Sequence, residues 1–281
     1  MTFLLSFLLG LSAFAEPPTL IDGEPALIGE WPASVYASMN GARCSATVVG
    51  PRTLAIAAHC VSNNGSASFS VGANRYTSRC QHSPDYRNNS TADYALCVID
   101  KEVIGIEFET FLTDASQISV GDTVRLSGYG CTKPGGGGGN DGIFRIGTSK
   151  VTRVPSGNNN DVVTQGNKGA LCFGDSGGGA FLEVGKNRWL FAVNSRGDIQ
   201  DTSYLSAWFS TQGKRFIESW ANSSGQKICG IHADTVGCRG AKQREPVDFE
   251  LKNSDTVLSV HVKPGPIPAA ELKKALVDVG F

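Results

Sequence analysis

Short strand-like runs recur along most of the chain and restrict its fold class. Apolar or alternating segments are separated by turns rich in Gly, Asn, Pro and Ser, as at 66–71, 123–126, 181–184 and 189–193. Many short strands with frequent turns are typical of closed antiparallel β architectures. The sequence therefore predicts an all-β fold.

One serine stands between small residues, in Gly174-Asp175-Ser176-Gly177-Gly178. Glycine permits positive φ, so the main chain can turn tightly here and a substrate carbonyl can approach the amides of Gly174 and Ser176. Those two amides would form an oxyanion hole. A Gly-Ser-Gly string also occurs in ordinary turns, and the chain holds 34 glycines. The partners of this serine must decide between the two interpretations.

A serine nucleophile needs a base, and a histidine base needs an acid that orients it. His59 follows the apolar runs 46–49 and 54–56, where a buried strand would end, and Asp93 precedes the apolar run 94–99. Each of these two residues also fits a capping or surface position. The other histidines, in polar or extension segments, are His82, His232 and His261.

The order His59, Asp93, Ser176 and the strings around these residues resemble the trypsin/chymotrypsin family of serine endopeptidases. The resemblance covers about residues 21 to 221 and implies two six-stranded antiparallel β-barrels with a closing C-terminal helix. His59 and Asp93 would come from the first barrel and Ser176 from the second. Further matching strings lie at 21–24, 29–32, 82–86, 128–130 and 195–197.

The first residues resemble an export signal. The run 2–14 is apolar, has no charged side chain, is too short to span a bilayer and leads into Ala13-Phe14-Ala15. We expect a signal peptide at 1–15, although no Lys or Arg precedes the apolar run, and a buried strand or helix is the alternative. No later stretch is apolar for long enough to be a membrane helix, which predicts a secreted or periplasmic protein.

The resemblance also implies a zymogen. Residues 16–20 would be a pro-segment, and cleavage before Ile21 would free an ammonium that pairs with Asp175 inside the protein. A buried carboxylate without its partner is unfavourable by roughly 3–5 kcal/mol, which would keep the oxyanion loop disordered until cleavage. Better-known members are cut after a basic residue, whereas Leu20 stands here, so the activating protease is left open.

Eight cysteines, an even number, fit an oxidising compartment. The usual partner of Cys172 in the family is missing here, and Cys131 is the expected substitute. Cys229 and Cys238 could bind zinc with His232, but three ligands are too few, and a small disulfide loop is favoured. The four expected bridges are Cys44–Cys60, from the resemblance, Cys80–Cys97, on neighbouring strand-like segments, Cys131–Cys172 and Cys229–Cys238.

Substrate-binding residues follow from the resemblance. Trypsin-like members carry an aspartate six positions before the nucleophile, where this chain has Ala170. With Leu171 beside it, the pocket is expected to take a small or medium apolar residue rather than Lys or Arg. Arg196 replaces the family's tryptophan and offers an alternative preference for acidic substrates. Gly197 would pair with extended substrate backbone, and Ser195 would donate a hydrogen bond to Asp93.

The segments after the catalytic strings have several predicted structures. The segment 133–140 is glycine-rich and is expected to be an exposed, mobile loop, and 214–220 has a helical apolar face. The protease domain is expected at 21–222. A small α+β extension of open role would follow at 223–281, with a hairpin made from 249–251 and 256–262 and a helix at 268–277. It could pack back on the protease, bind a partner or serve export.

These features together predict a secreted serine endopeptidase. The net charge is −1 and Lys and Arg are spread out, which argues against nucleic acid or an anionic membrane as partner. We expect a monomer that acts on polypeptides and needs no metal or organic cofactor. The alternatives are a catalytically silent homologue that serves as a binding or adhesion module, and a protein whose main role is carried by its tail.

Overall fold

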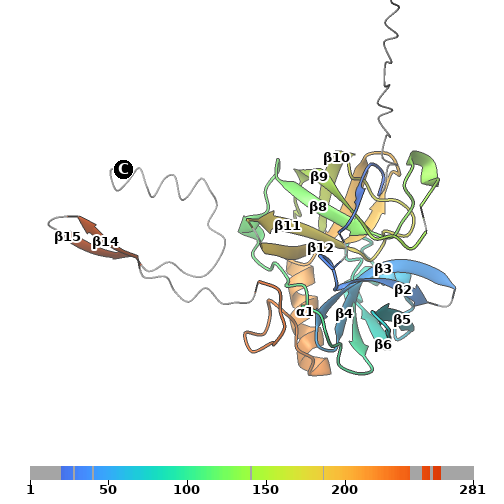
Figure 1. The fold of residues 1–281 in the computed structure, drawn as a ribbon, viewed down its shortest axis with the longest axis horizontal. Helices are drawn as coiled ribbons and strands as arrows, with labels where there is room; N and C mark the ends of the chain where they lie inside the picture. Colours follow the sequence, from blue (N-terminus) through green and yellow to red (C-terminus); the bar gives the residue numbers. More distant parts are fainter. Residues whose placement is uncertain are drawn as a thin grey trace, which may run out of the picture.

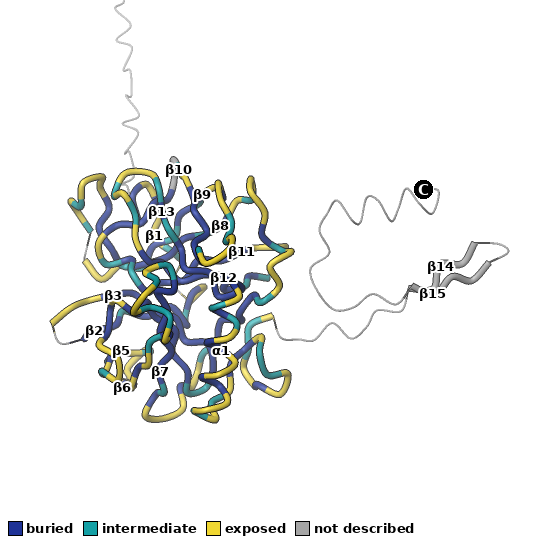
Figure 2. The backbone as a smooth tube through the Cα atoms, turned by 180° about the vertical axis from the view of Figure 1, so that it is seen from behind, coloured by how far each residue is buried: buried dark blue, intermediate teal, exposed yellow. Residues whose placement is uncertain are grey.

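The computed structural model describes residues 20–27, 29–39, 41–139, 141–185 and 187–240, and the backbone of a hairpin at 249–253 and 256–260. Its body consists of two closed antiparallel β-barrels, one above the other in Figure 1, with one α-helix after the second barrel. Figure 2 shows that buried backbone is concentrated inside the barrels and where they meet. The predicted all-β fold of two six-stranded barrels is confirmed.

The first barrel has the strand order β2-β3-β4-β7-β6-β5 and closes where Ser38 of β2 pairs with Ser68 of β5. Along β6, Tyr76, Ser78 and Cys80 are buried while the residues between them are exposed, the alternation of a sheet with one face on a core. Its strands are β2 (Ser34–Met39), β3 (Ala42–Gly50), β4 (Thr53–Ile56), β5 (Ser66–Val71), β6 (Asn74–His82) and β7 (Ala95–Ile99).

The second barrel has the order β9-β10-β13-β12-β11-β8 and is closed by pairing of β8 with β9. A short strand, β1 (Glu24–Pro25), adds to β9. Its six strands are β8 (Thr123–Gly128), β9 (Arg145–Arg153), β10 (Asp161–Lys168), β11 (Gly179–Val184), β12 (Asn187–Gly197) and β13 (Thr202–Ala207).

The helix α1 (Thr211–Ser224) confirms the predicted helix and is longer than the predicted 214–220 at both ends. Ser210 caps it by accepting a hydrogen bond from the amide of Gly213, and Gly225 ends it in the left-handed conformation. Buried residues of its apolar face include Phe216, Ile217 and Trp220. The described chain also has four 3-10 turns, η1 (Ala58–Cys60), η2 (Pro84–Arg87), η3 (Ala115–Gln117) and η4 (Pro134–Gly136).

After α1 the chain returns to the barrels. The amide of Cys229 donates to Val49 O at 2.8 Å, the amide of Phe111 donates to Cys229 O at 3.0 Å, and the amide of Arg239 donates to Phe108 O at 2.8 Å. Of the roles left open for the residues after 222, packing back on the preceding domain therefore holds for this part of the chain.

Beyond residue 240, the described backbone is a hairpin of β14 (Phe249–Asn253) and β15 (Thr256–Val260). A hairpin was expected here; its first strand runs to Asn253 rather than 251, and residues 261–262 of its expected second strand lie outside the described residues. The helix expected at 268–277 lies outside the described residues. In the described part of the chain, no helix has the length and apolarity needed to cross a membrane.

Four disulfides join Cys44 to Cys60, Cys80 to Cys97, Cys131 to Cys172, and Cys229 to Cys238. The first two lie in the first barrel, and the third ties the start of the glycine-rich loop to the turn that carries Ser176. The fourth closes the segment that follows α1. Disulfide bonding, expected from the even number of cysteines, is confirmed.

The glycine-rich loop is a compact, largely exposed turn. The amides of Thr132 and Lys133 both donate to Gly137 O, and the amide of Gly135 donates to Ile199 O at 3.0 Å. Gly135 and Gly136 adopt positive φ, and a Cβ at Gly136 would meet the Phe173 ring at 2.9 Å. Glycine is therefore needed here for the loop to lie against Phe173.

Candidate active site

A cavity of about 450 Å³ is lined by groups from both barrels. Its lining brings together seven residues expected at the site, and a further set that the sequence analysis did not single out as site residues. The expected residues are His59, Asp93, Leu171, Ser176, Ser195 and Arg196, together with Gly197. The additional residues are Tyr86, Ser90, Cys172, Phe173 and Ile199.

Two of the expected polar groups, His59 and Asp93, are joined by hydrogen bonds. His59 lies in η1, just after β4, and Asp93 lies just before β7 and is 2% exposed. The Nδ1 of His59 is 2.6 Å from Asp93 Oδ2, and the His59 amide donates to Asp93 Oδ1 at 2.9 Å. The hydroxyl of Ser195 donates to Asp93 Oδ2 at 2.6 Å. Asp93 therefore holds the His59 ring through Nδ1. The Nε2 of His59 is the nitrogen left for other partners.

A β-bulge sets the direction of Ser195. Asn194 pairs with Leu205 and Arg196 pairs with Tyr204, so Ser195 is an extra residue in β12 opposite β13. A bulge bends the strand locally and redirects its side chains. It lets two neighbouring residues, Ser195 and Arg196, both line the cavity.

Ser176 lies in the turn before β11 and is fixed through its backbone. The Ser45 amide donates to Ser176 O at 2.9 Å, and the Ser45 hydroxyl donates to Gly174 O at 2.8 Å. Gly177 adopts a φ of 81°, and a Cβ there would lie 2.3 Å from Ser45 O. In the described chain no hydrogen bond joins the Ser176 hydroxyl to His59, and such bonds often form only when substrate is present.

The peptide group between Phe173 and Gly174 has a defined direction. Phe173 O accepts a hydrogen bond from the Cys131 amide at 2.9 Å. Because a trans peptide directs its N–H opposite to its C=O, the Gly174 N–H points away from Cys131. Among the described residues, neither the Gly174 nor the Ser176 amide donates a hydrogen bond to another group of the chain. Two free amides thus stand on either side of Asp175.

The side chain of Asp175, between these two amides, is fully buried. Its carboxylate accepts from the amides of Gly130 at 2.8 Å and Cys172 at 2.9 Å. Burial raises the pKa of Asp175 to about 7, against the opposing effects of these two amides and of the Arg145 charge. Ile21 is only 2% exposed and packs in a small apolar cluster with Ala170 and with the Cys131–Cys172 bridge.

Ala170 is the one expected substrate-binding residue that does not line the cavity. It lies in the same cluster as Ile21 and is 1% exposed, and its amide donates to Ile21 O at 3.2 Å. Leu171 lines the cavity instead, held by a hydrogen bond from its amide to the hydroxyl of Ser203. Phe173, which is 62% exposed, and Ile199 add apolar surface to the lining.

Arg196 has a charged partner inside the protein. Its guanidinium forms an ion pair with Asp161, the first residue of β10, whose side chain is 1% exposed. The guanidinium also lies 5.0 Å from the centre of the Tyr204 ring. Its charge is therefore balanced within the chain.

Some of the additional lining residues carried a sequence signal. Tyr86 belongs to the string 82–86 that supports the resemblance, and Phe173 lies three positions before the serine. Asp161 carried none, because nothing near it in sequence indicates that Arg196, 35 positions later, will meet it.

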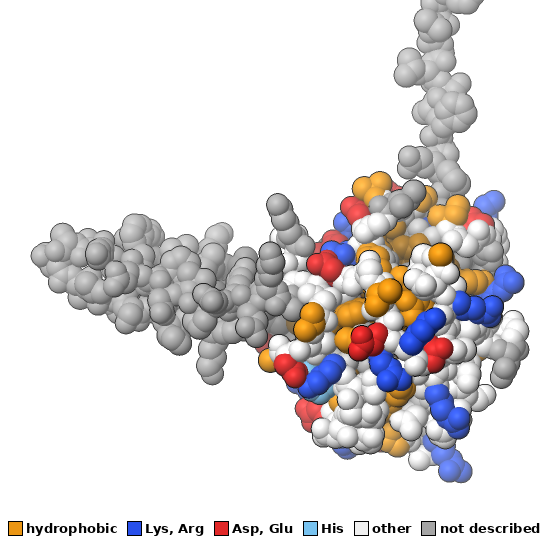
Figure 3. Space-filling model, turned by 60° about the horizontal axis from the view of Figure 1, so that its bottom comes forward, with side chains coloured by type: hydrophobic (Ala, Val, Ile, Leu, Met, Phe, Trp, Pro, Cys, Tyr) orange, Lys and Arg blue, Asp and Glu red, His pale blue; other side chains and the backbone are white. Residues whose placement is uncertain are grey.

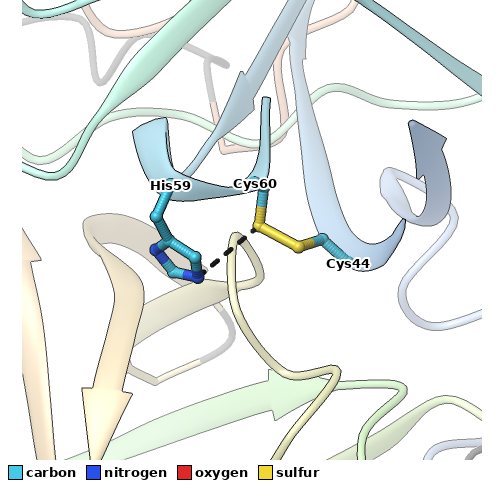
Figure 4. Close-up of side chains that lie close together, drawn as sticks. All are labelled: Cys44, His59 and Cys60. Carbon is cyan, nitrogen blue, oxygen red and sulfur yellow. Dashed lines mark hydrogen bonds between the residues drawn. A yellow bond between two sulfur atoms is a disulfide. The ribbon is translucent and has the colours of Figure 1, made fainter. Parts of the chain in front are cut away.

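Figure 4 shows one group of candidate metal ligands, His59 with Cys44 and Cys60. The two sulfur atoms are bonded to each other, and His59 Nε2 lies 3.8 Å from Cys60 Sγ. Disulfide sulfur lacks the thiolate charge that binds zinc, so this group does not fit a metal site.

On the face shown in Figure 3, Lys and Arg side chains lie among Asp and Glu side chains.

The two six-stranded barrels, with a histidine, an aspartate and a serine at the cavity between them, define a serine protease of the chymotrypsin fold. A model of the trypsin family matches residues 20–207, and the chain belongs to this family. No curated protein matches the chain.

Proposed function

We propose that this protein is a secreted serine endopeptidase in which Ser176 is the nucleophile, His59 the base and Asp93 the residue that orients the base. The observation that carries this proposal is the pair of 2.6 Å contacts on Asp93 Oδ2, from His59 Nδ1 and from the Ser195 hydroxyl, at a cavity that Ser176 also lines. Four disulfides support export, because such bonds persist in oxidising compartments.

The reaction follows from these positions. With its Nδ1 proton held by Asp93, His59 takes the hydroxyl proton of Ser176 at Nε2 while Oγ attacks the carbonyl carbon of the scissile bond. The free amides of Gly174 and Ser176 are suited to bind the oxyanion, each worth roughly 10²–10³ in rate. His59 then gives the proton to the leaving amine, and water hydrolyses the acyl-enzyme with the same base.

A fluorophosphonate probe tests this function directly. The chain that begins at Ile21 is expected to be labelled once, at Ser176, because the probe reacts only with an activated serine. Intact-mass analysis measures the adduct, and a Ser176→Ala variant is expected to remain unlabelled. A folded chain that begins at Ile21 and is not labelled would contradict the proposal and favour the silent homologue.

Activation is proposed to occur by cleavage before Ile21. Asp175 is buried, has two backbone donors, and lies beside the turn that carries the two free amides. A new ammonium at Ile21, in the cluster next to it, would supply the cation that a buried carboxylate needs. The segment 16–20 would then act as the pro-segment, and its removal would be the activating step.

For primary specificity we propose a small or medium apolar residue before the scissile bond. Leu171, Phe173 and Ile199 give the cavity an apolar lining, while Arg196 is already paired with Asp161. Cleavage of a peptide library by the activated enzyme is expected to show this preference, with little cleavage after Lys or Arg. A wild-type preference for Asp or Glu would contradict the proposal and favour Arg196 as an anion-binding residue.

A further inference from the structure

The ion pair of Arg196 with Asp161 is connected to Asp93 through the hydroxyl of Ser195. Arg196 Nη1 is 3.3 Å from the Ser195 hydroxyl, which donates to Asp93 Oδ2, and the same guanidinium is paired with Asp161. Asp93 Oδ2 in turn meets His59 Nδ1. A continuous chain of polar contacts therefore runs from the buried carboxylate of Asp161 to the imidazole.

The direction of each hydrogen bond in this chain is fixed by chemistry. A guanidinium can only donate, and an ionised carboxylate can only accept. The Ser195 hydroxyl therefore accepts from Arg196 and has its single proton left for Asp93. Arg196 thus keeps the Ser195 proton pointed at the carboxylate that orients His59, rather than at another acceptor.

Negatively and positively charged groups alternate along these contacts, from Asp161 through Arg196 to Asp93. A lone cation next to Ser195 would attract Asp93 and disfavour a protonated His59, which would weaken it as a base. Asp161 offsets that cation, and its side chain is 1% exposed, so water screens the pair little from that side.

We propose that Arg196 and Asp161 are positioning residues that hold Ser195 on Asp93 and set the basicity of His59. The proposal rests on the proposed function only where it concerns catalysis, since the hydrogen bonds and charges act on His59 in the resting protein. The bulge at Ser195 is what allows Arg196 to reach both Ser195 and Asp161.

Ionisable groups from other elements also lie near these polar contacts. Tyr86 from η2, Arg153 from β9 and Tyr204 from β13 surround the Arg196–Asp161 pair. Burial raises the pKa of Asp161, Arg196 and Arg153 oppose that rise, and the charge of Asp93 adds to it. The two carboxylates on either side of Arg196 therefore influence each other.

The test is an NMR titration of His59 in the Ser176→Ala background, with the signal assigned by its loss in His59→Gln. Asp161→Asn, which keeps an acceptor for the guanidinium but removes the charge, is expected to lower the His59 pKa by about 0.5 unit or more. Arg196→Gln is expected to raise it. Glu183→Gln, which neutralises a carboxylate paired with Arg125 elsewhere, is the control and should leave it unchanged.

Opposite shifts in the two variants would support the proposal, because a merely structural disturbance would move both in the same direction. An unchanged His59 pKa, or shifts of the same sign, would overturn it. If Asp161→Asn does not fold, Arg196→Gln decides alone, and a fall or no change there overturns the proposal. The titration needs no turnover, so its outcome is separate from the labelling experiment that tests the protease function.

Discussion

Between pH 5 and pH 8, the chain that still carries residues 16–20 is expected to lose on the order of 3 kcal/mol of unfolding free energy through Asp175 alone. Burial raises the pKa of this carboxyl in the folded chain to about 7, whereas in the unfolded chain it keeps its ordinary value of 3.8. The folded state therefore binds the proton more tightly. The contribution is most favourable below about pH 4 and is lost as pH rises through 7.

Urea denaturation at a series of pH values measures this effect. An Asp175→Asn variant of the same chain is the control, because its side chain does not ionise and its curve should lack this fall. A chain that begins at Ile21 is also expected to lack it, since its ammonium would stabilise the ionised carboxylate. If all three chains show the same pH dependence, Asp175 is not the acid that couples cleavage to folding.

Glu109→Ala is expected to destabilise the protein by about 3–5 kcal/mol, because it leaves a buried arginine without its counter-ion. Glu109 is 0% exposed and accepts from Arg188 Nε at 3.1 and 3.0 Å. The Arg188 guanidinium lies 3.6 Å from the centre of the Trp31 ring and also donates to Glu30 O at 2.8 Å. Arg239 Nε lies 3.7 Å from the same carboxylate, so this cluster also holds the segment that follows α1.

The same denaturation experiment on Glu183→Ala gives the matched control. Its carboxylate is 2.9 Å from Arg125 Nε, but both side chains are more than a third exposed, and such a pair is worth about 0–1 kcal/mol. The two variants therefore remove the same group from the same kind of partner at different depths. Equal losses in the two would show that the buried cluster around Glu109 does not hold the barrels and the C-terminal segment together.

The strings around His59, Asp93 and Ser176 could be recognised from sequence because their geometry is local. A glycine-flanked serine turn needs glycine for its own φ values, and η1 follows a short buried strand within a few residues. The alternation of apolar residues likewise predicted the strands, since a sheet with one face on a core requires it. The predicted helix was too short because its ends depend on the Ser210 and Gly225 caps rather than on the apolar face.

The sequence by itself determined the fold class, the family and the set of candidate catalytic residues, because each depends on short-range pattern. Only the tertiary structure decided which distant residues support them. Asp161 meets Arg196 because β10, β13 and β12 lie side by side in register and a bulge turns Ser195, and Glu109 meets Arg188 and Arg239 across separate segments. Ala170 likewise lies with Ile21 rather than in the cavity. Such contacts depend on strand register and barrel closure, which no local string of residues specifies.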